Sequence, residues 1–292
     1  MSNAQPGQSR TLRTADGESL AVREWLSTPA APLGLIHITH GLGEHAGRYA
    51  HVARRLNALG FAVRAHDHFG HGLSSGPRGG LSHDLRMVDD LALLIDDARA
   101  AYPGLPLVLL GHSMGGLVAA SFVSRGTRPV DGLVLSSPAL APTLSVAQKG
   151  LIAVLSRIAP GLRVSNGLNA QDLSHDPAVA PAYREDPLNH DRIGARLARF
   201  LADEGERVLA AAPRWPVPTL LIYAGADRLV RPEGSRAFAA AAAPSGQVQA
   251  LAFERHFHEL FNELDAKPVF DSLEQWLVMR FGFDARRAAA LA

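Results

Sequence analysis

A serine flanked by glycines is the strongest candidate nucleophile in this sequence. The GHSMG pentapeptide at 111–115 follows an apolar run at 107–110, so Ser113 is expected where a short buried strand gives way to a helix. The glycines permit a bend too sharp for larger side chains. A serine hydroxyl presented on such a bend can attack a carbonyl carbon while nearby backbone amides stabilise the developing negative charge. The same pentapeptide is also compatible with an ordinary strand-to-helix turn.

Candidate partners for this serine follow two later apolar runs. A serine hydroxyl needs a histidine base, and that histidine needs a carboxylate to orient it. Asp227 follows the run at 219–223, and His256 and His258 follow the run at 248–253. Serine, aspartate and histidine in this chain order form one of the orders in which catalytic triads occur. From their positions alone, both histidines remain candidates for the base.

Backbone donors for an oxyanion are predicted from two loops. The HGLGEH segment at 40–45 follows an apolar run that ends near Ile38, and its glycines allow the backbone to approach a substrate closely. The N–H of Leu42 and the N–H of Met114 are therefore the candidate pair. We expect His40 to form a hydrogen bond within its own loop rather than to act as a base.

Predicted strands and helices, which must position these residues, alternate along the chain. Apolar runs without polar alternation indicate strands that are buried on both faces, and stretches of helical period separate them. The runs lie at 33–38, 60–64, 107–110, 132–135, 219–223 and 248–253, and the clearest helical stretches lie at 49–59 and 87–101. This pattern predicts a doubly wound, mostly parallel α/β sheet, opened by an antiparallel pair around Asp16 and Gly17.

The alternation breaks at 141–213, where no convincing strand is found. We expect residues 1–140 and 214–292 to form two parts of one core, with 141–213 as an inserted helical cap. Two apolar faces at helical spacing are predicted in the cap: Val146, Leu151, Ile152, Leu155 and Ile158, then Ile193, Leu197, Phe200, Leu201 and Val208. These faces either pack on the core or form the roof of an acyl-chain pocket.

Composition excludes several classes of function. The chain has 292 residues, 47% of them hydrophobic, and 29 basic against 28 acidic residues, so it provides no basic field for nucleic acid. It contains no cysteine, which excludes a thiol nucleophile and a disulfide framework. The polar N-terminus and the lack of an 18-residue apolar run predict a soluble, cytoplasmic protein. The cap helices lack a strongly basic face, so weak and reversible membrane contact is the most that we expect.

Five segments together resemble the monoacylglycerol lipase and lysophospholipase branch of the α/β-hydrolases. They are HGLGEH at 40–45 with RY at 48–49, HDHFGHGLS at 66–74, GHSMGG at 111–116, GAD at 225–227 and FHELFNE at 257–263. The resemblance runs from about residue 12 to about residue 280 and implies an ester hydrolase that needs no cofactor. Monoacylglycerol cleavage to glycerol and fatty acid through an acyl-enzyme is the expected reaction. Lysophospholipase, short-chain carboxylesterase and non-catalytic binding protein are the alternatives.

The resemblance also implies roles for individual residues. Ser113 is the nucleophile, Asp227 the orienting acid and His258, not His256, the base. Leu42 and Met114 then supply the oxyanion N–H groups. The resemblance further places Glu44 and Arg48 at the substrate.

Two further features concern the histidine-rich run at 66–71 and the position of Phe261. The HDHFGH run at 66–71 superficially suggests a metallohydrolase cluster, but Gly70 stands where such a site uses an aspartate, so no metal is predicted. By the resemblance this loop is structural, with Asp67 and the histidines bonded to backbone near the site. Mammalian members carry a second histidine three residues after the base, where this chain has Phe261.

Overall fold

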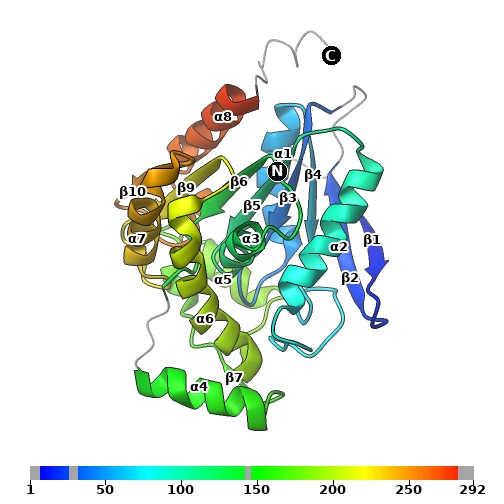
Figure 1. Cartoon of the computed structure of the whole chain (residues 1–292), viewed down its shortest axis with the longest axis vertical. Coiled ribbons are helices and arrows are strands. Elements are labelled where there is room, and N and C mark those ends of the chain that lie inside the picture. Colours follow the sequence, from blue (N-terminus) through cyan, green and yellow to red (C-terminus); the bar gives the residue numbers. More distant parts are fainter. Residues whose placement is uncertain (1–6, 26–31, 142–145, 282–292) are drawn as a thin grey trace.

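A twisted eight-stranded sheet forms the centre of the computed structural model, which describes residues 7–25, 32–141 and 146–281 (Figure 1). The strands are β1 (Gln8–Arg13), β2 (Ser19–Trp25), β3 (Gly34–Thr39), β4 (Phe61–His66), β5 (Leu107–His112), β6 (Gly132–Ser136), β9 (Thr219–Ala224) and β10 (Val248–Phe253). Their order is β1-β2-β4-β3-β5-β6-β9-β10. Strands β1 and β2 run antiparallel to their neighbours, and all the other pairs are parallel. The predicted α/β sheet and its opening antiparallel pair are confirmed.

Helices cover both faces of this sheet, so its inner strands from β3 to β9 are buried along their whole length. Within β5, Leu109 faces one core and Leu110 the other. The Leu109 side is covered by α2 (Arg86–Ala101), α3 (Met114–Ser124) and α7 (Pro232–Ala242), and the Leu110 side by α1 (Ala50–Ala58) and α8 (Lys267–Phe281). Each face therefore has its own hydrophobic core.

The cap is the stretch between β6 and β9. It contains α4 (Val146–Ile158), β7 (Arg163–Ser165), η2 (Ala170–Asp172), α5 (Val179–Glu185), β8 (Arg192–Gly194), α6 (Ala195–Ala211) and η3 (Ala212–Arg214). Helix α6 packs on α3 of the core, and α4 packs on α6 at the lower end of the view in Figure 1. No helix in the described parts of the chain has both the length and the apolar character needed to cross a bilayer.

The expectation that the cap contains no strand is wrong. Strands β7 and β8 pair in antiparallel fashion, with Val164 opposite Ile193. Each has only three residues, and β7 is exposed along its whole length, so neither leaves a hydrophobic pattern that a sequence window could detect.

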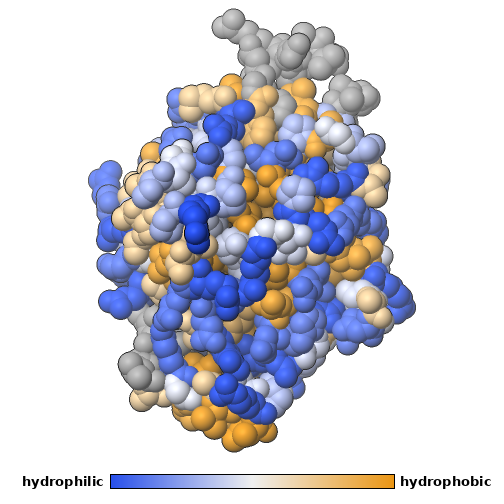
Figure 2. All heavy atoms as spheres, in the orientation of Figure 1, coloured by the Kyte–Doolittle hydropathy of each residue, from blue (hydrophilic) through white to orange (hydrophobic). Residues whose placement is uncertain are grey.

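The two predicted apolar faces of the cap differ in burial. On the second face, Leu197, Phe200 and Val208 are fully packed in the core. On the first, Leu151 and Ile158 keep 58% and 75% of their surface exposed, because α4 packs against α6 on one side only. Apolar surface accordingly gathers at the lower end of the molecule in Figure 2, and the side chain of Val146 lies outside the described residues.

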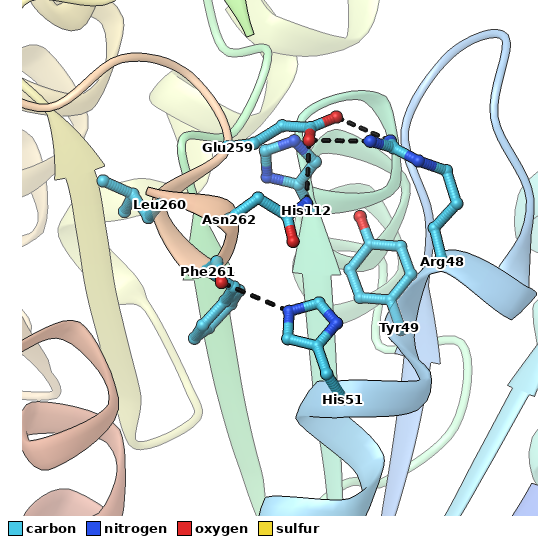
Figure 3. A pocket seen from close by; sticks show the side chains of 8 residues that line it. All are labelled: Arg48, Tyr49, His51, His112, Glu259, Leu260, Phe261 and Asn262. Carbon is cyan, nitrogen blue, oxygen red and sulfur yellow. Dashed lines mark hydrogen bonds and ion pairs between the residues drawn. The ribbon is translucent and has the colours of Figure 1, made fainter. Parts of the chain in front are cut away.

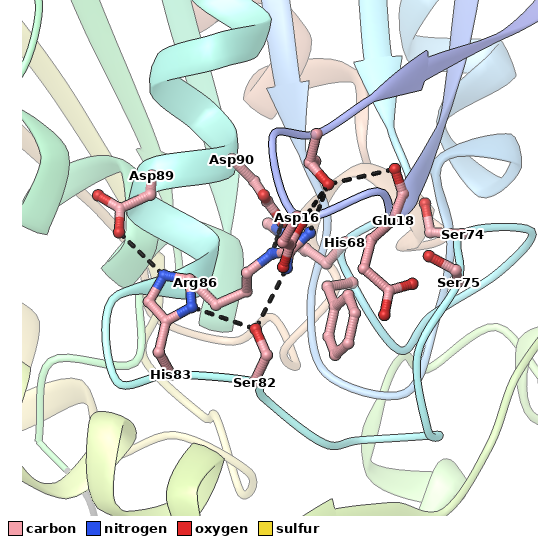
Figure 4. A network of polar contacts seen from close by, with 12 residues as sticks. Asp16, Glu18, His68, Ser74, Ser75, Ser82, His83, Arg86, Asp89 and Asp90 are labelled. Carbon is pink, nitrogen blue, oxygen red and sulfur yellow. Dashed lines mark hydrogen bonds and ion pairs between the residues drawn. The ribbon is translucent and has the colours of Figure 1, made fainter.

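A buried arginine holds the β1–β2 hairpin against the helical layer. Arg86, at the start of α2, donates to Asp16 in the hairpin turn at 2.5 Å and to Asp90 one turn along its own helix at 2.8 Å (Figure 4). The guanidinium also lies 4.4 Å from the ring centre of Phe69. Burial raises the pKa of Asp90 to about 6, even though the arginine opposes this shift.

Candidate active site

Ser113 occupies a strained turn between β5 and α3. Its backbone angles are φ 52° and ψ −119°, a region that residues with a side chain rarely adopt. The flanking glycines are required by close backbone contacts. A Cβ at Gly111 would lie 2.5 Å from the carbonyl oxygen of Gly115, and a Cβ at Gly115 would lie 2.2 Å from that of Thr39. The surrounding packing therefore holds the serine in this conformation.

Asp227 and His258 form a buried pair at the neighbouring strand ends. Nδ1 of His258 donates to Oδ2 of Asp227 at 2.6 Å, and Oδ1 of Asp227 accepts from the amides of Leu229 and Val230, each at 2.9 Å. Burial disfavours the imidazolium, but the charge and hydrogen bond of Asp227 outweigh it and raise the pKa of His258. Burial alone would raise the pKa of Asp227, whereas His258 and the two amides lower it below its usual value.

His256, the other candidate from the sequence, lies apart from this pair. Its Nε2 donates to the carbonyl oxygen of Asp265 at 3.0 Å. Unlike His258, it does not line the cavity that contains Ser113. The structure thus brings only one of the two histidines to the candidate acid.

The loop after β3 passes directly beside Ser113. A Cβ built on Gly41 would lie 3.3 Å from Cβ of Ser113, which places the following residue, Leu42, next to the candidate nucleophile. Within the described part of the chain, neither the N–H of Leu42 nor that of Met114 donates to a protein acceptor. His40 is bonded within its own loop, from Nδ1 to the carbonyl oxygen of Gly41 at 2.8 Å, as predicted.

A cavity of about 520 Å³ opens over Ser113 and His258. This volume lies within the range usual for small-molecule sites. The cap contributes apolar wall residues to it, among them Ile152, Ile193 and Leu201. Part of each predicted apolar face therefore covers the cavity, while the rest of the second face packs into the core.

Glu44 and Arg48 also line this cavity, but their polar groups are engaged within the protein. Oε1 of Glu44 accepts from the N–H of Gly41 at 2.6 Å and from the hydroxyl of Tyr49 at 2.8 Å. Arg48 donates to Oε2 of Glu44 and, with two nitrogens, to Glu259. The two residues expected at the substrate thus belong to an ion-pair network in the cavity wall.

Residues 173–175 of the cap are hydrogen-bonded to the loop that carries His258. The N–H of Glu259 donates to the carbonyl oxygen of Leu173, and Oγ of Ser174 donates to that of Asn262, both at 2.8 Å. His175 and Glu263 contact through Nδ1 and Oε1 at 2.9 Å. We call these contacts the seam.

A row of buried histidines lies beneath the site. His37 and His66 contact at 3.0 Å and His66 and His68 at 3.2 Å, while Nε2 of His40 accepts from the backbone N–H of His68 at 3.0 Å. Burial lowers the pKa of His37 to about 3 and that of His40 to about 4, so these rings are neutral.

Asp67, within the same run, bonds to backbone as the resemblance implies. Its two oxygens accept from the amides of Ala46 and Leu73, each at 2.8 Å. The expectation for the histidines holds for His71, which contacts the carbonyl oxygen of Phe69, but not for His66, whose ring bonds to two other imidazoles. Among the described residues, no group of three histidine, aspartate or glutamate side chains is arranged to hold a metal ion.

Sequence reasoning missed Glu259 and Tyr183 as parts of the site. Glu259 stands inside the FHELFNE segment, directly after the candidate base, and its charge was the available signal. The ring of Tyr183 lies 5.1 Å from the guanidinium carbon of Arg48, and its hydroxyl donates to the carbonyl oxygen of Gly43 at 3.1 Å. No local pattern predicts that contact, since it joins the cap to a loop 140 residues earlier.

The fold and the placement of these groups at the carboxyl ends of the parallel strands define an α/β-hydrolase. A family profile described as "Serine aminopeptidase, S33" matches residues 30–265. A monoacylglycerol lipase of Mycolicibacterium smegmatis is 37% identical, over 85% of this chain and 89% of the relative. The monoglyceride lipase of Homo sapiens is 35% identical, over 92% and 90%. The crystal structure of a Paleococcus ferrophilus monoacylglycerol lipase superposes with a TM-score of 0.80 at 35% identity, covering 89% of this chain and 99% of that one. The chain therefore belongs to the α/β-hydrolase family described by this serine aminopeptidase S33 profile, in the branch that contains the monoglyceride lipases.

Proposed function

We propose that this protein is a serine hydrolase that cleaves carboxylic esters of single-chain lipids, with monoacylglycerol as the preferred substrate. The observation that carries the proposal is that Ser113, on its strained turn, and the His258–Asp227 pair share one cavity with a mostly apolar wall. The names of the relatives support the substrate class.

The proposed reaction starts with attack on the ester carbonyl. Nδ1 of His258 is engaged with Asp227, so Nε2 is the nitrogen left to take the proton from the hydroxyl of Ser113. The serine oxygen bonds to the carbonyl carbon, and the amides of Leu42 and Met114, which have no acceptor among the described residues, receive the oxyanion. Asp227 stabilises the imidazolium that forms.

Collapse of this intermediate releases the alcohol. The imidazolium gives its proton to the leaving glycerol oxygen as the C–O bond breaks, which leaves the acyl group on Ser113. His258 then takes a proton from water, and the hydroxide attacks the acyl ester. Return of the proton to the serine oxygen releases the fatty acid and restores the enzyme.

We also propose that the cap makes weak contact with lipid surfaces. Six large apolar side chains of α4 and the segment after it are at least one-third exposed: Leu151, Val154, Ile158, Leu162, Val164 and Leu168. Figure 1 places α4 at the lower end of the molecule, where Figure 2 shows apolar surface. Exposed apolar surface of this kind supports reversible binding at a membrane interface. Co-sedimentation with liposomes no greater than that of the Leu151→Ser/Ile158→Ser variant would contradict this part.

The decisive experiment compares kcat/KM for 1-monooleoylglycerol with that for a lysophosphatidylcholine of the same chain. p-Nitrophenyl butyrate serves as the positive control, and Ser113→Ala as the inactive one. A strong preference for the glycerol ester is expected. Preference for the phospholipid would indicate a lysophospholipase, cleavage of butyrate alone a short-chain carboxylesterase, and no hydrolysis a binding protein.

A further inference from the structure

One arginine is shared by two buried carboxylates from different loops. Nitrogen NH1 of Arg48 lies 2.5 Å from Oε2 of Glu44 and 2.6 Å from Oε1 of Glu259, and NH2 lies 2.8 Å from Oε2 of Glu259. The side chains of the three residues are only 14%, 4% and 5% exposed, in the order Arg48, Glu44, Glu259. Figure 3 shows the guanidinium facing Glu259 from across a small pocket.

The carboxylate oxygens of this network have partners inside the protein. Glu44 is held by Gly41 and Tyr49, and Oε2 of Glu259 also accepts from Nδ2 of Asn262 at 2.8 Å. Burial alone would raise the pKa of Glu44, but Arg48 and the N–H of Gly41 help to lower it to about 2. Glu259 is bonded to the guanidinium through both of its oxygens. The network therefore carries two negative charges and one positive charge, and its effect is electrostatic as well as structural.

These charges lie close to the proposed base. Glu259 directly follows His258 in the chain, and Glu44 belongs to the loop that passes beside Ser113. The charged and titratable groups that act on His258 are Asp227 after β9, Glu259 in its own loop, Glu44 after β3 and His112 of β5. Arg48 and, from the cap, Tyr183 contact each other and line the same cavity as His258. Burial lowers the pKa of His112 to about 4, and burial raises the pKa of Tyr183, so both are neutral near pH 7.

We propose that Arg48 is a positioning residue that acts as a counter-charge, preventing the carboxylates around His258 from holding this base in its protonated form. The proposal rests on His258 being the base, as proposed above. Without Arg48, two uncompensated carboxylates would join Asp227 in stabilising the imidazolium. An imidazolium cannot accept the proton of Ser113, so the enzyme would need a higher pH to work.

The proposal predicts opposite shifts for the two partners of one ion pair. The acid limb of the profile is the pH range in which kcat/KM falls because the base becomes protonated. Arg48→Gln removes the positive charge and should move this acid limb to higher pH, by on the order of half to one pH unit. Glu259→Gln removes a negative charge and should move the limb to lower pH by a similar amount. The double variant removes a neutral pair, so its limb should return close to the wild-type position.

The test is the pH dependence of p-nitrophenyl butyrate hydrolysis from about pH 5 to about pH 9, with the wild type and all the variants measured in one buffer series. This small ester has neither a lipid headgroup nor a long acyl chain, so its hydrolysis does not depend on how the enzyme binds either of them. Arg48→Lys is the matched control, because it keeps the charge and loses the two-nitrogen fork. Its limb should stay at the wild-type position, whatever happens to kcat.

Two outcomes would overturn the counter-charge role. Single variants that shift the limb in the same direction, or that lower the rate equally at every pH, would show that the network only holds the loops together. If Arg48→Gln does not fold, Glu259→Gln and Arg48→Lys decide by the same criterion. A wild-type profile with no acid limb would instead contradict the role of His258 as the base. The proposed function would then be wrong, rather than the role of Arg48 alone.

Discussion

A methyl group at position 115 would force the strained serine turn away from the loop that follows β3. The added Cβ would lie 2.2 Å from the carbonyl oxygen of Thr39 and 2.4 Å from that of His40. Both neighbours are backbone atoms and cannot rotate away as a side chain would. The two segments must therefore separate by about 0.8 Å or more before the contact reaches roughly 3.0 Å.

This separation acts directly on the proposed oxyanion site. The N–H of Met114 belongs to the turn, and the N–H of Leu42 belongs to the loop that would be pushed away. Such donors work over roughly 2.7–3.1 Å, and loss of one donor costs about 10²–10³ in kcat. The strain should also lower the free energy of unfolding by about 1–3 kcal/mol. We expect Gly115→Ala to lose activity out of proportion to its loss of stability.

The assay is kcat on p-nitrophenyl butyrate, together with urea unfolding of the same preparation. Gly150→Ala is the control, because a Cβ there has nothing within 4 Å and the residue lies inside α4. Its unfolding free energy should rise by about 1 kcal/mol, with kcat unchanged. A Gly115→Ala enzyme with wild-type kcat, or one whose loss matches its unfolded fraction, would refute the reasoning.

Four further predictions concern the site and its support. Ser113→Gly and Ser113→Ala should both be inactive, but the glycine variant should be more stable by about 1 kcal/mol because it relieves the positive φ; equal unfolding midpoints would mean that the turn is unstrained. His258→Ala should lower kcat by about 10⁴-fold or more, while His256→Ala stays near wild type, and the reverse result would reassign the base. Because Asp227 raises the pKa of His258, kcat/KM should fall as the pH drops through a value above about 6.5; a limb well below that value would contradict the pairing. Gly205→Ala should lose about 1–3 kcal/mol of stability by urea unfolding, since its Cβ would lie 2.2 Å from a carbonyl oxygen, unlike the exposed glycine of α4; a stabilised variant would contradict this packing.

The sequence predicted the central sheet well because buried parallel strands leave a strong signal. The run at 107–110 lies at the start of β5, which is buried throughout and continues to His112. The run at 248–253 coincides with β10, but the expectation that it is buried on both faces is wrong, because β10 is the edge strand and none of its residues is fully buried. The ends of β3, β5, β9 and β10 then located the candidate site residues, because the carboxyl ends of parallel strands share one edge. That edge brings the predicted aspartate and histidine within hydrogen-bonding distance.

Sequence patterns predicted the helices of the cap but not its two short strands, the one-sided packing of α4 or the charge network. Strands of three exposed residues carry no periodicity, and the apolar spacing of α4 does not reveal that only one side of the helix has a neighbour. The partner of Arg48 is 211 residues away in the chain, so its charge alone could not predict an ion pair with Glu259. Contacts of this kind depend on the folded arrangement rather than on local sequence.

The seam makes this cap a poor candidate for simple exchange between relatives. A graft that replaced the whole stretch between β6 and β9 would also replace Leu173, Ser174 and His175, the residues that bond to the loop carrying the proposed base. Substrate preference and turnover would then change together, and a hybrid enzyme would report on neither alone. Chimeras that retain 173–175 and exchange α4 and α6 would leave the loop with the proposed base anchored while the apolar wall of the cavity is redesigned.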